Sequence, residues 1–467
     1  MKPSWANLIN MRMIASSPIK INYITMKKFI KNYAFVAFAA LSIAACKKDQ
    51  KNGVNFSGSN GKDAKLQLMV TAPKSVSTYA AGDENATDAE MKINTLDVFV
   101  YDDGAPFTLT SYVHIDGSDV YEADGKTIKT QTLDVKTGAK QVFVAVNISP
   151  EIVDKLKSNY AHMNTAIDVD MSTLVNSDGS VAMFNESINR ITISDNAGAN
   201  KITVPVSRLV AKTSVKSGQS LALSSIAGGT LSQLNYTIGQ ANTKQIIAPL
   251  VNFQDANWFA ADHNASDLRP VDVATFQPVN AASATIGNQN TMYAPENTSK
   301  EHQHNQVTYV SVRAKFKPST LTGTEPLAAD GTFYAVFTNY GVYYFGSLAE
   351  AQQYAVKNGG ATPMTYNNGH CYYRLYLNPE GNVMGEGKYD LLRNVYYNAT
   401  VTKINGLGTP GENQFNGDNG TPANPGAPLT PTDPVSPTDP IAPSKKVSIE
   451  ATITIVPWTM HAADYEI

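Results

Sequence analysis

KVSIEATITIV, residues 446–456, is the most regular alternating segment of this 467-residue chain. Aliphatic side chains occupy every second position, so they share one face of a β-strand, while polar side chains occupy the other face. The aliphatic row consists of Val447, Ile449, Ala451, Ile453 and Ile455, and Pro457 and Trp458 close the segment. An apolar strand promotes aggregation unless a partner covers it, so residues 446–458 are expected to complete a sheet.

A segment rich in proline and glycine precedes this strand. Residues 408–444 are dominated by Gly, Pro, Asn, Asp and Thr and end in the repeat PTDPVSPTDPIAP. Proline fixes φ and removes a backbone donor, which predicts an extended, semi-rigid spacer. The strand could fold back onto its own domain or complete a neighbouring subunit. A long spacer favours the neighbour, because connections within a domain are usually short.

The N-terminal region contains a pattern typical of bacterial lipoprotein export. Beginning at Met26, three lysines precede a short apolar run that is too short to span a bilayer. The run ends in small residues directly before Cys46. We therefore expect residues 26–45 to be a lipoprotein signal peptide and Cys46 to carry the lipid; the alternative is an ordinary signal peptide. Residues 1–25 fit no targeting pattern and are expected not to be translated.

Composition predicts an all-β protein. Plentiful Tyr, Thr, Val and Ile favour strands, and the net charge of −3 with 16% charged residues excludes a nucleic-acid-binding footprint. With Cys46 lipidated, Cys371 would have no disulfide partner, so stability must come from apolar cores. Many short strands separated by polar turns predict two β-sandwich domains, over residues 81–220 and 221–467, with a boundary near 217–220.

Several segments carry clear strand or helix patterns. Residues 65–71 place Leu66, Leu68 and Val70 on one face, and residues 201–215 form one long strand-like run. Residues 93–101 and 140–148 are more continuously apolar than residues 65–71, as expected for strands that are buried on both faces. The better helix candidates are residues 150–159 and 347–357.

No motif indicates an enzyme, a cofactor or a metal centre. The chain lacks a P-loop, a GxSxG segment and an HExxH segment. His302 and His304 would share one face of a strand, but no third ligand is evident, so we expect a polar loop. Trp258 and the tyrosines could line a sugar site, although core or sheet-surface positions are the more ordinary interpretation.

Taken together, these segments resemble the type V fimbrillins of Bacteroidales, most of all the stalk subunit of the minor (short) fimbrium. The most similar parts are ITIVPWTMHAADYEI (residues 453–467) and the Asp-Pro-rich spacer. The order of the supporting segments along the chain adds specificity. They are VFVAVNISP (142–150), VPVSRLVAKTSV (204–215), YAPEN (293–297), VTYVSVRAKFKP (307–318) and LLRNVYYNATVTKINGLG (391–408).

The resemblance implies transthyretin-like β-sandwiches and assembly by strand exchange. A surface protease would remove an N-terminal strand, and the C-terminal strand of the next subunit would fill the opened groove. On this basis residues 46–80 are a propeptide whose removable strand carries Leu66, Leu68 and Val70. The implied partners are identical or related fimbrial subunits in a head-to-tail filament, the lipoprotein export machinery and the protease. The lipid would hold the precursor at the outer membrane before the mature subunit joins the surface fimbrium.

The expected processing region departs from the family pattern. Family members are cut after an arginine, whereas the region marked by Thr71, Lys74 and Ala80 contains none, and Lys74 is the nearest basic residue. Two other functions stay open. One is a non-polymerising, glycan-binding surface lipoprotein, and the other is a tip or anchor component of the same fimbrium. The tethered C-terminal strand favours the stalk subunit.

Overall fold

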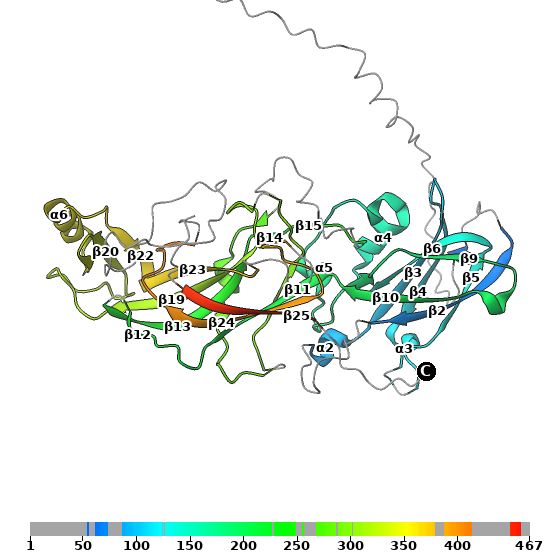
Figure 1. Cartoon of the computed structure of the whole chain (residues 1–467), viewed down its shortest axis with the longest axis horizontal. Coiled ribbons are helices and arrows are strands. Elements are labelled where there is room, and N and C mark those ends of the chain that lie inside the picture. The colour runs from blue at the N-terminus through cyan, green and yellow to red at the C-terminus, as the bar shows by residue number, and fades with distance from the viewer. Residues whose placement is uncertain are drawn as a thin grey trace, which may run out of the picture. The chain divides into compact units, whose positions relative to one another are not determined.

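The protein consists mainly of β-strands (Figure 1). A computed structural model describes residues 54–55, 61–72, 86–123, 125, 127–226, 228–248, 255, 268–285, 288–300, 302–378, 387–412 and 449–458. The sequence-based expectation of an all-β, sandwich-like fold is confirmed. Within these ranges no helix is both long and apolar enough to cross a membrane.

The first sandwich is built from one path of paired strands that encloses a core. Its order is β1 (Val54–Asn55), β4 (Leu109–Asp116), β3 (Thr95–Asp102), β6 (Gly138–Val146), β8 (Met183–Asn185), β10 (Lys201–Arg208), β2 (Asp63–Thr71) and β5 (Gln131–Lys136), with β9 (Asn189–Ile193) on β6. β10 joins the two layers, because residues 206–208 pair with β8 and residues 201–205 pair with β2. Aliphatic side chains of β2 therefore pack in one core with those of β3 and β6.

β3 and β6 are buried on both faces, as their continuous apolar sequences predict. One face meets the core shared with β2, and the other face packs Phe99 and Phe143 against a second cluster that includes α4 (Pro150–Ser158). The other α-helices of the described residues are α2 (Asp88–Met91), α3 (Gly117–Val120), α5 (Met171–Leu174) and α6 (Leu348–Asn358). The 3-10 turns described are Tyr160–Met163, Ala197–Ala199, Val273–Thr275 and Asn367–Gly369.

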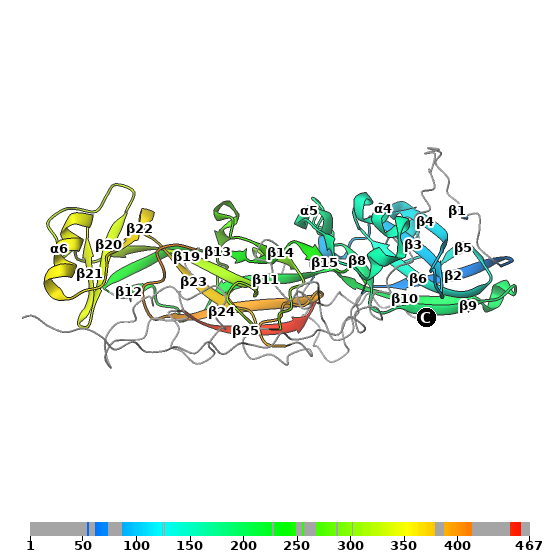
Figure 2. The same ribbon diagram turned by 90° about the horizontal axis from the view of Figure 1, so that it is seen from above.

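The second sandwich has two sheets around the largest core. One sheet has the order β18 (Met292–Pro295), β11 (Val210–Ser217), β24 (Val395–Ile404) and β25 (Ile449–Pro457). The other has the order β12 (Ser224–Ile226), β13 (Gly229–Gly239), β19 (Tyr309–Pro318) and β23 (His370–Tyr376), with β17 (Gln277–Pro278) on β13. Figure 2 shows β25, in red, beside β24.

Three small sheets complete the part of the fold that the structure describes. β20 (Phe333–Thr338) pairs with β21 (Gly341–Phe345) and β22 (Met364–Tyr366), and α6 packs against the first two. The two-stranded sheets are β14 (Ala241–Asn242) with β16 (Leu268–Arg269), and β15 (Lys244–Gln245) with β7 (Ile167–Asp168).

The run of residues 201–215, expected as one strand, is divided between the two sandwiches. β10 pairs within the first sandwich and β11 pairs within the second, so the sheets change at Leu209. This change comes earlier in the chain than the expected boundary near 217–220. The apolar alternation continues through Leu209, so the sequence pattern carries no break at the position where the pairing partners change.

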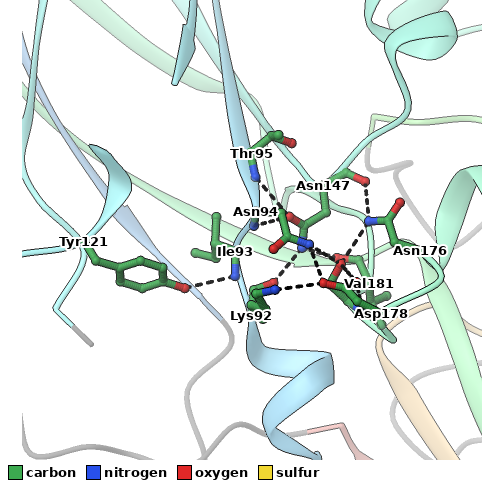
Figure 3. A network of polar contacts seen from close by, with 10 residues as sticks. Lys92, Ile93, Asn94, Thr95, Tyr121, Asn147, Asn176, Asp178 and Val181 are labelled. Carbon is green, nitrogen blue, oxygen red and sulfur yellow. Dashed lines mark hydrogen bonds and ion pairs between the residues drawn. The ribbon is translucent and has the colours of Figure 1, made fainter. Parts of the chain in front are cut away.

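Asn147 anchors the chain that enters β3 (Figure 3). Its φ of 56° lies in the left-handed region, which asparagine tolerates better than most residues. Its Oδ1 accepts hydrogen bonds from the backbone N–H groups of Asn94 (2.7 Å) and Thr95 (3.3 Å). Its Nδ2 donates to the carbonyl oxygens of Lys92 (2.7 Å) and Val181 (3.1 Å). One side chain thus ties β3 to two other segments.

Asp178 extends this network toward the surface. Its carboxylate accepts hydrogen bonds from Ser180 Oγ (2.7 Å) and Asn94 Nδ2 (2.9 Å), and Lys92 Nζ lies 3.0 Å away. The bonds from Ser180, followed by those from Asn94 and Lys92, hold the pKa of Asp178 well below its usual range. The backbone at residues 92–95 is therefore fixed from two sides.

Two substitutions at Asn147 should distinguish the stability that comes from its hydrogen bonds from the cost of its backbone conformation. Asn147→Ala loses the bonds and forces alanine into a positive φ, so we expect a loss of about 3 kcal/mol in the free energy of unfolding. Asn147→Gly relieves the φ cost and should lose about 1–2 kcal/mol. The exposed Asn164→Ala should change stability by no more than about 0.5 kcal/mol in the same urea titration. An unchanged Asn147→Gly variant would contradict the anchoring role.

β2 offers a second test, because adjacent residues face opposite ways. Leu68 is completely buried, whereas Met69 is 45% exposed. In the unprocessed chain, Leu68→Ala should lower the free energy of unfolding by about 2–5 kcal/mol through lost burial and a residual cavity. Met69→Ala should cost less than about 1 kcal/mol. Equal effects, measured by urea denaturation, would show that β2 is not an integral part of the core.

Candidate functional site

β2 lies between two strands of the first sandwich. Residues 67–71 run parallel to residues 201–205 of β10, and residues 63–68 run antiparallel to residues 131–136 of β5. Within the described ranges β5 pairs with no other strand. Withdrawal of β2 would therefore leave the facing edges of β5 and β10 without hydrogen-bond partners.

The two faces of β2 differ in character. Leu66, Leu68 and Val70, the side chains expected on one face of a removable strand, are all buried in the first core. Asp63 forms an ion pair with Lys136 of β5 at 2.7 Å on the exposed side. The strand thus contributes an aliphatic row to the core and a solvated row to the surface.

The described part of the expected processing region is limited to its first two residues, 71 and 72. Thr71 is the last residue of β2. Lys74, Ala80 and the lipidation candidate Cys46 lie outside the described residues. The chain is described again from Ala86, and Thr87 caps α2 through reciprocal bonds with Glu90.

β25 forms an edge strand of the second sandwich. It runs antiparallel to β24 and has no described strand on its other edge. Ile449, Ala451 and Ile453 face the second core, while the alternate residues are exposed. Ile455 lies opposite Tyr397 in the register, and Val447 lies outside the described residues. In the single chain the strand therefore completes its own sheet, one of the two alternatives open from the sequence, and insertion into a neighbour stays a prediction.

Trp458 follows β25 and is completely buried. Its backbone N–H donates to the carbonyl oxygen of Asn394 at 3.0 Å, and its carbonyl oxygen accepts from Arg208 Nη1 at 2.7 Å. The guanidinium carbon of Arg208 lies 4.3 Å from the indole centroid, and the Tyr293 ring stacks on the indole at 5.7 Å. Trp458 therefore fixes the end of β25 against β10 and β18.

A buried ion pair lies beside Trp458. Lys212 Nζ is 2.8 Å from Glu90 Oε1 and 5.4 Å from the indole centroid, and both charged side chains are only 2% exposed. The hydroxyl of Tyr293 donates to Glu90 at 2.6 Å. Burial lowers the pKa of Arg208 to about 10 and also lowers the pKa of Lys212, while the charge of Glu90 opposes both shifts. Two cations and one carboxylate thus share a buried position.

This charged cluster was not predicted from the sequence. Arg208 and Lys212 interrupt the apolar run VPVSRLVAKTSV, which signals that their charges need partners. The partners are remote, however, because Arg208 and Trp458 are 250 positions apart. Glu90 is 122 positions from Lys212 and lies in a helix of one turn.

The weaker chemical candidates do not form a site within the described residues. No group of three or more metal-ligating side chains occurs there. His304 Nδ1 lies 2.9 Å from the Tyr376 hydroxyl, and His302 contacts the ring of Tyr389 edge-on. Cys371 is buried, which raises the pKa of its thiol to about 11. Trp258 lies outside the described ranges.

Comparisons with known proteins find fimbrial relatives. The family model "Major fimbrial subunit protein (FimA)" matches residues 64–246, and the model "Major fimbrial subunit protein type IV, Fimbrillin, C-terminal" matches residues 364–464. Two relatives, both described as minor fimbrium subunit Mfa1 of Porphyromonas gingivalis, are 24% identical over 505 residues. Each alignment covers 94% of this chain and 100% of the relative.

A solved structure supports the fold. It is described as a cell adhesion protein of Parabacteroides distasonis, with 13% identity and a TM-score of 0.50, and the match covers 87% of this chain and 99% of that chain. Fimbrillin models thus match both sandwiches, and a minor fimbrium subunit aligns along nearly the whole sequence. The chain accordingly belongs to the fimbrillin family of Bacteroidales type V fimbriae, and within it resembles the minor fimbrium subunit.

Proposed function

We propose that this fimbrial subunit forms the stalk of a cell-surface type V fimbrium and polymerises by inserting its C-terminal strand into a neighbouring subunit. The precursor is exported as a lipoprotein through Cys46, and the assembled filament supports adhesion. The observation that carries the proposal is the position of β2 between β5 and β10, with its aliphatic row in the core.

β2 and β25 each present a row of three aliphatic side chains to a core, so one row resembles the other in chemistry and spacing. β2 contributes Leu66, Leu68 and Val70 to the first core, and β25 contributes Ile449, Ala451 and Ile453 to the second. Burial of each large aliphatic side chain is worth about 1.5–3 kcal/mol, so a groove emptied of β2 would favour any strand that restores the row. Added backbone hydrogen bonds would give the insertion its direction.

The location of β25 suits a strand that can leave its sheet. Among the described strands it pairs with β24 only, and the Pro-rich segment that precedes it provides reach. A head-to-tail contact between unlike surfaces does not close on itself, so repeated insertion produces a filament.

A tip or anchor component and a glycan-binding lipoprotein would use β2, β25 and Cys46 differently. A tip component would not need a C-terminal donor strand, and an anchor would keep Cys46 and the strand that contains Leu68. A glycan-binding lipoprotein would not need β2 to be removable. The pairing of β2 and the edge position of β25 among the described strands favour the stalk subunit over these alternatives.

Deleting residues 446–467 should abolish filaments seen by electron microscopy, because the chain then lacks its donor strand. The deleted subunit keeps its acceptor groove, so co-expression with the intact chain should cap growth and shorten the filaments. This second readout separates loss of the donor from loss of folding. Thr452→Ala, an exposed change on the same strand, should leave filament length unchanged. Filaments that persist at normal length in the deletion strain would refute the proposal.

Processing should remove β2 from every assembled subunit. N-terminal sequencing of purified filaments should place the mature start between Thr71 and Asp83, and Lys74→Ala should accumulate precursor if the protease cuts after Lys74. Lys62→Ala, at an exposed lysine before β2, serves as the control and should be processed normally. Filament subunits that retain Cys46 would instead identify an anchor component.

A further inference from the structure

Three segments with separate roles in the proposed assembly meet at Trp458. Glu90 belongs to α2, the first helix described after the expected processing region. Arg208 and Lys212 belong to β10 and β11, on either side of the point where the sheets change. Trp458 ends the strand proposed as the donor. Contacts among these side chains therefore connect the segment that follows the expected processing region with the end of β25.

Arg208 depends on Trp458 for its main interactions. The guanidinium is completely buried, and its Nε and Nη2 have no hydrogen-bond partner in the part of the chain that the structure describes. Nη1 donates to the Trp458 carbonyl at 2.7 Å and lies 3.4 Å from Asn394 Oδ1. A buried cation is costly unless acceptors and an aromatic face compensate, and Trp458 supplies one of each. Departure of Trp458 would give water access to Arg208.

Glu90 supplies a negative charge that stabilises Arg208 and Lys212 in their buried positions beside Trp458. Its carboxylate contacts Lys212 at 2.8 Å, and its charge raises the pKa of both Lys212 and Arg208 against the effect of burial. Without that charge the position would hold two neighbouring buried cations. Repulsion and desolvation would then both favour the open, hydrated state in which Trp458 has left.

The placement of Glu90 is sensitive to the chain on either side of it. α2 has four residues, and a single helical turn has little stability of its own. On its C-terminal side the Asn147 network fixes residues 92–95 (Figure 3). On its N-terminal side the chain leads directly to the expected processing region. Cleavage there would leave α2 attached at one end only.

We propose that Glu90, Arg208, Lys212 and Trp458 form a latch, in which the Glu90 carboxylate offsets one of two buried cations, and that this latch keeps β25 on its own sheet until processing loosens Glu90. The link to processing rests on the proposed function, whereas the latch itself is a property of the single chain. It delays release of the donor strand until the same subunit can accept one.

The test measures amide hydrogen exchange of residues 449–458 in the full-length, unprocessed chain. Glu90→Gln keeps the shape and removes the charge, so exchange should accelerate by about a hundredfold, the scale of losing one partner of a buried ion pair. Adding Lys212→Met removes one cation, and the double variant should return most of the way to the wild-type rate. Asp97→Asn is the matched control: this buried carboxylate contacts Tyr112 and His114. It should leave exchange in β25 unchanged.

Two results would overturn the latch. One is a wild-type exchange rate in Glu90→Gln, and the other is equal acceleration in the single and double variants, which would reduce Glu90 to a packing role. Because amide hydrogen exchange is measured on unprocessed single chains, the result does not depend on filament growth. A working latch combined with filaments that survive deletion of residues 446–467 would refute the polymerisation proposal and leave the latch standing.

Discussion

The backbone edges of β5 and β10 depend on β2 for their hydrogen bonds, and this pairing constrains the rest of the molecule. β2 runs parallel to one neighbour and antiparallel to the other, and its aliphatic row lies in the core formed with β3 and β6. A sandwich cannot lose such a strand and keep both its core and its pairing. In the proposed assembly the requirement is met by another subunit, so folding and polymerisation satisfy the same need.

The second constraint is electrostatic and acts where β10 continues into β11. That continuous run carries Arg208 and Lys212 into a position closed by Trp458. Buried charges contribute little net stability, because their desolvation offsets their mutual attraction. Buried charges can instead make stability conditional. In the proposed latch, burial of Arg208 and Lys212 is favourable only while Glu90 and Trp458 are both in place. An apolar cluster of equal volume would hold the tail without depending on Glu90.

Local patterns predicted much of the fold. The alternation at Leu66, Leu68 and Val70 and the apolar run of β6 each report burial from neighbouring residues alone, and both are confirmed. The division at Leu209 could not be predicted, because alternation states that a strand is buried and not which sheet it joins. The aliphatic face of β25 was predictable for the same local reason. The partners of Trp458 were not, since they depend on contacts between remote parts of the chain.

A count of strand neighbours indicates which way the proposed exchange should run. Among the described strands β25 has one neighbour, β24, whereas β2 lies between two, β5 and β10. A strand that moves from the first position to the second gives up one ladder of hydrogen bonds and gains two. β2 pairs at five positions with β10 and at six with β5, whereas β25 pairs at nine positions with β24, so the exchange gains about two paired positions, with each hydrogen bond worth about 0.5–1.5 kcal/mol net. Strand exchange is then favoured once β2 has been removed. While β2 is present, exchange is disfavoured because β2 occupies the groove between β5 and β10. The free energy for assembly therefore comes from the pairing that processing removes.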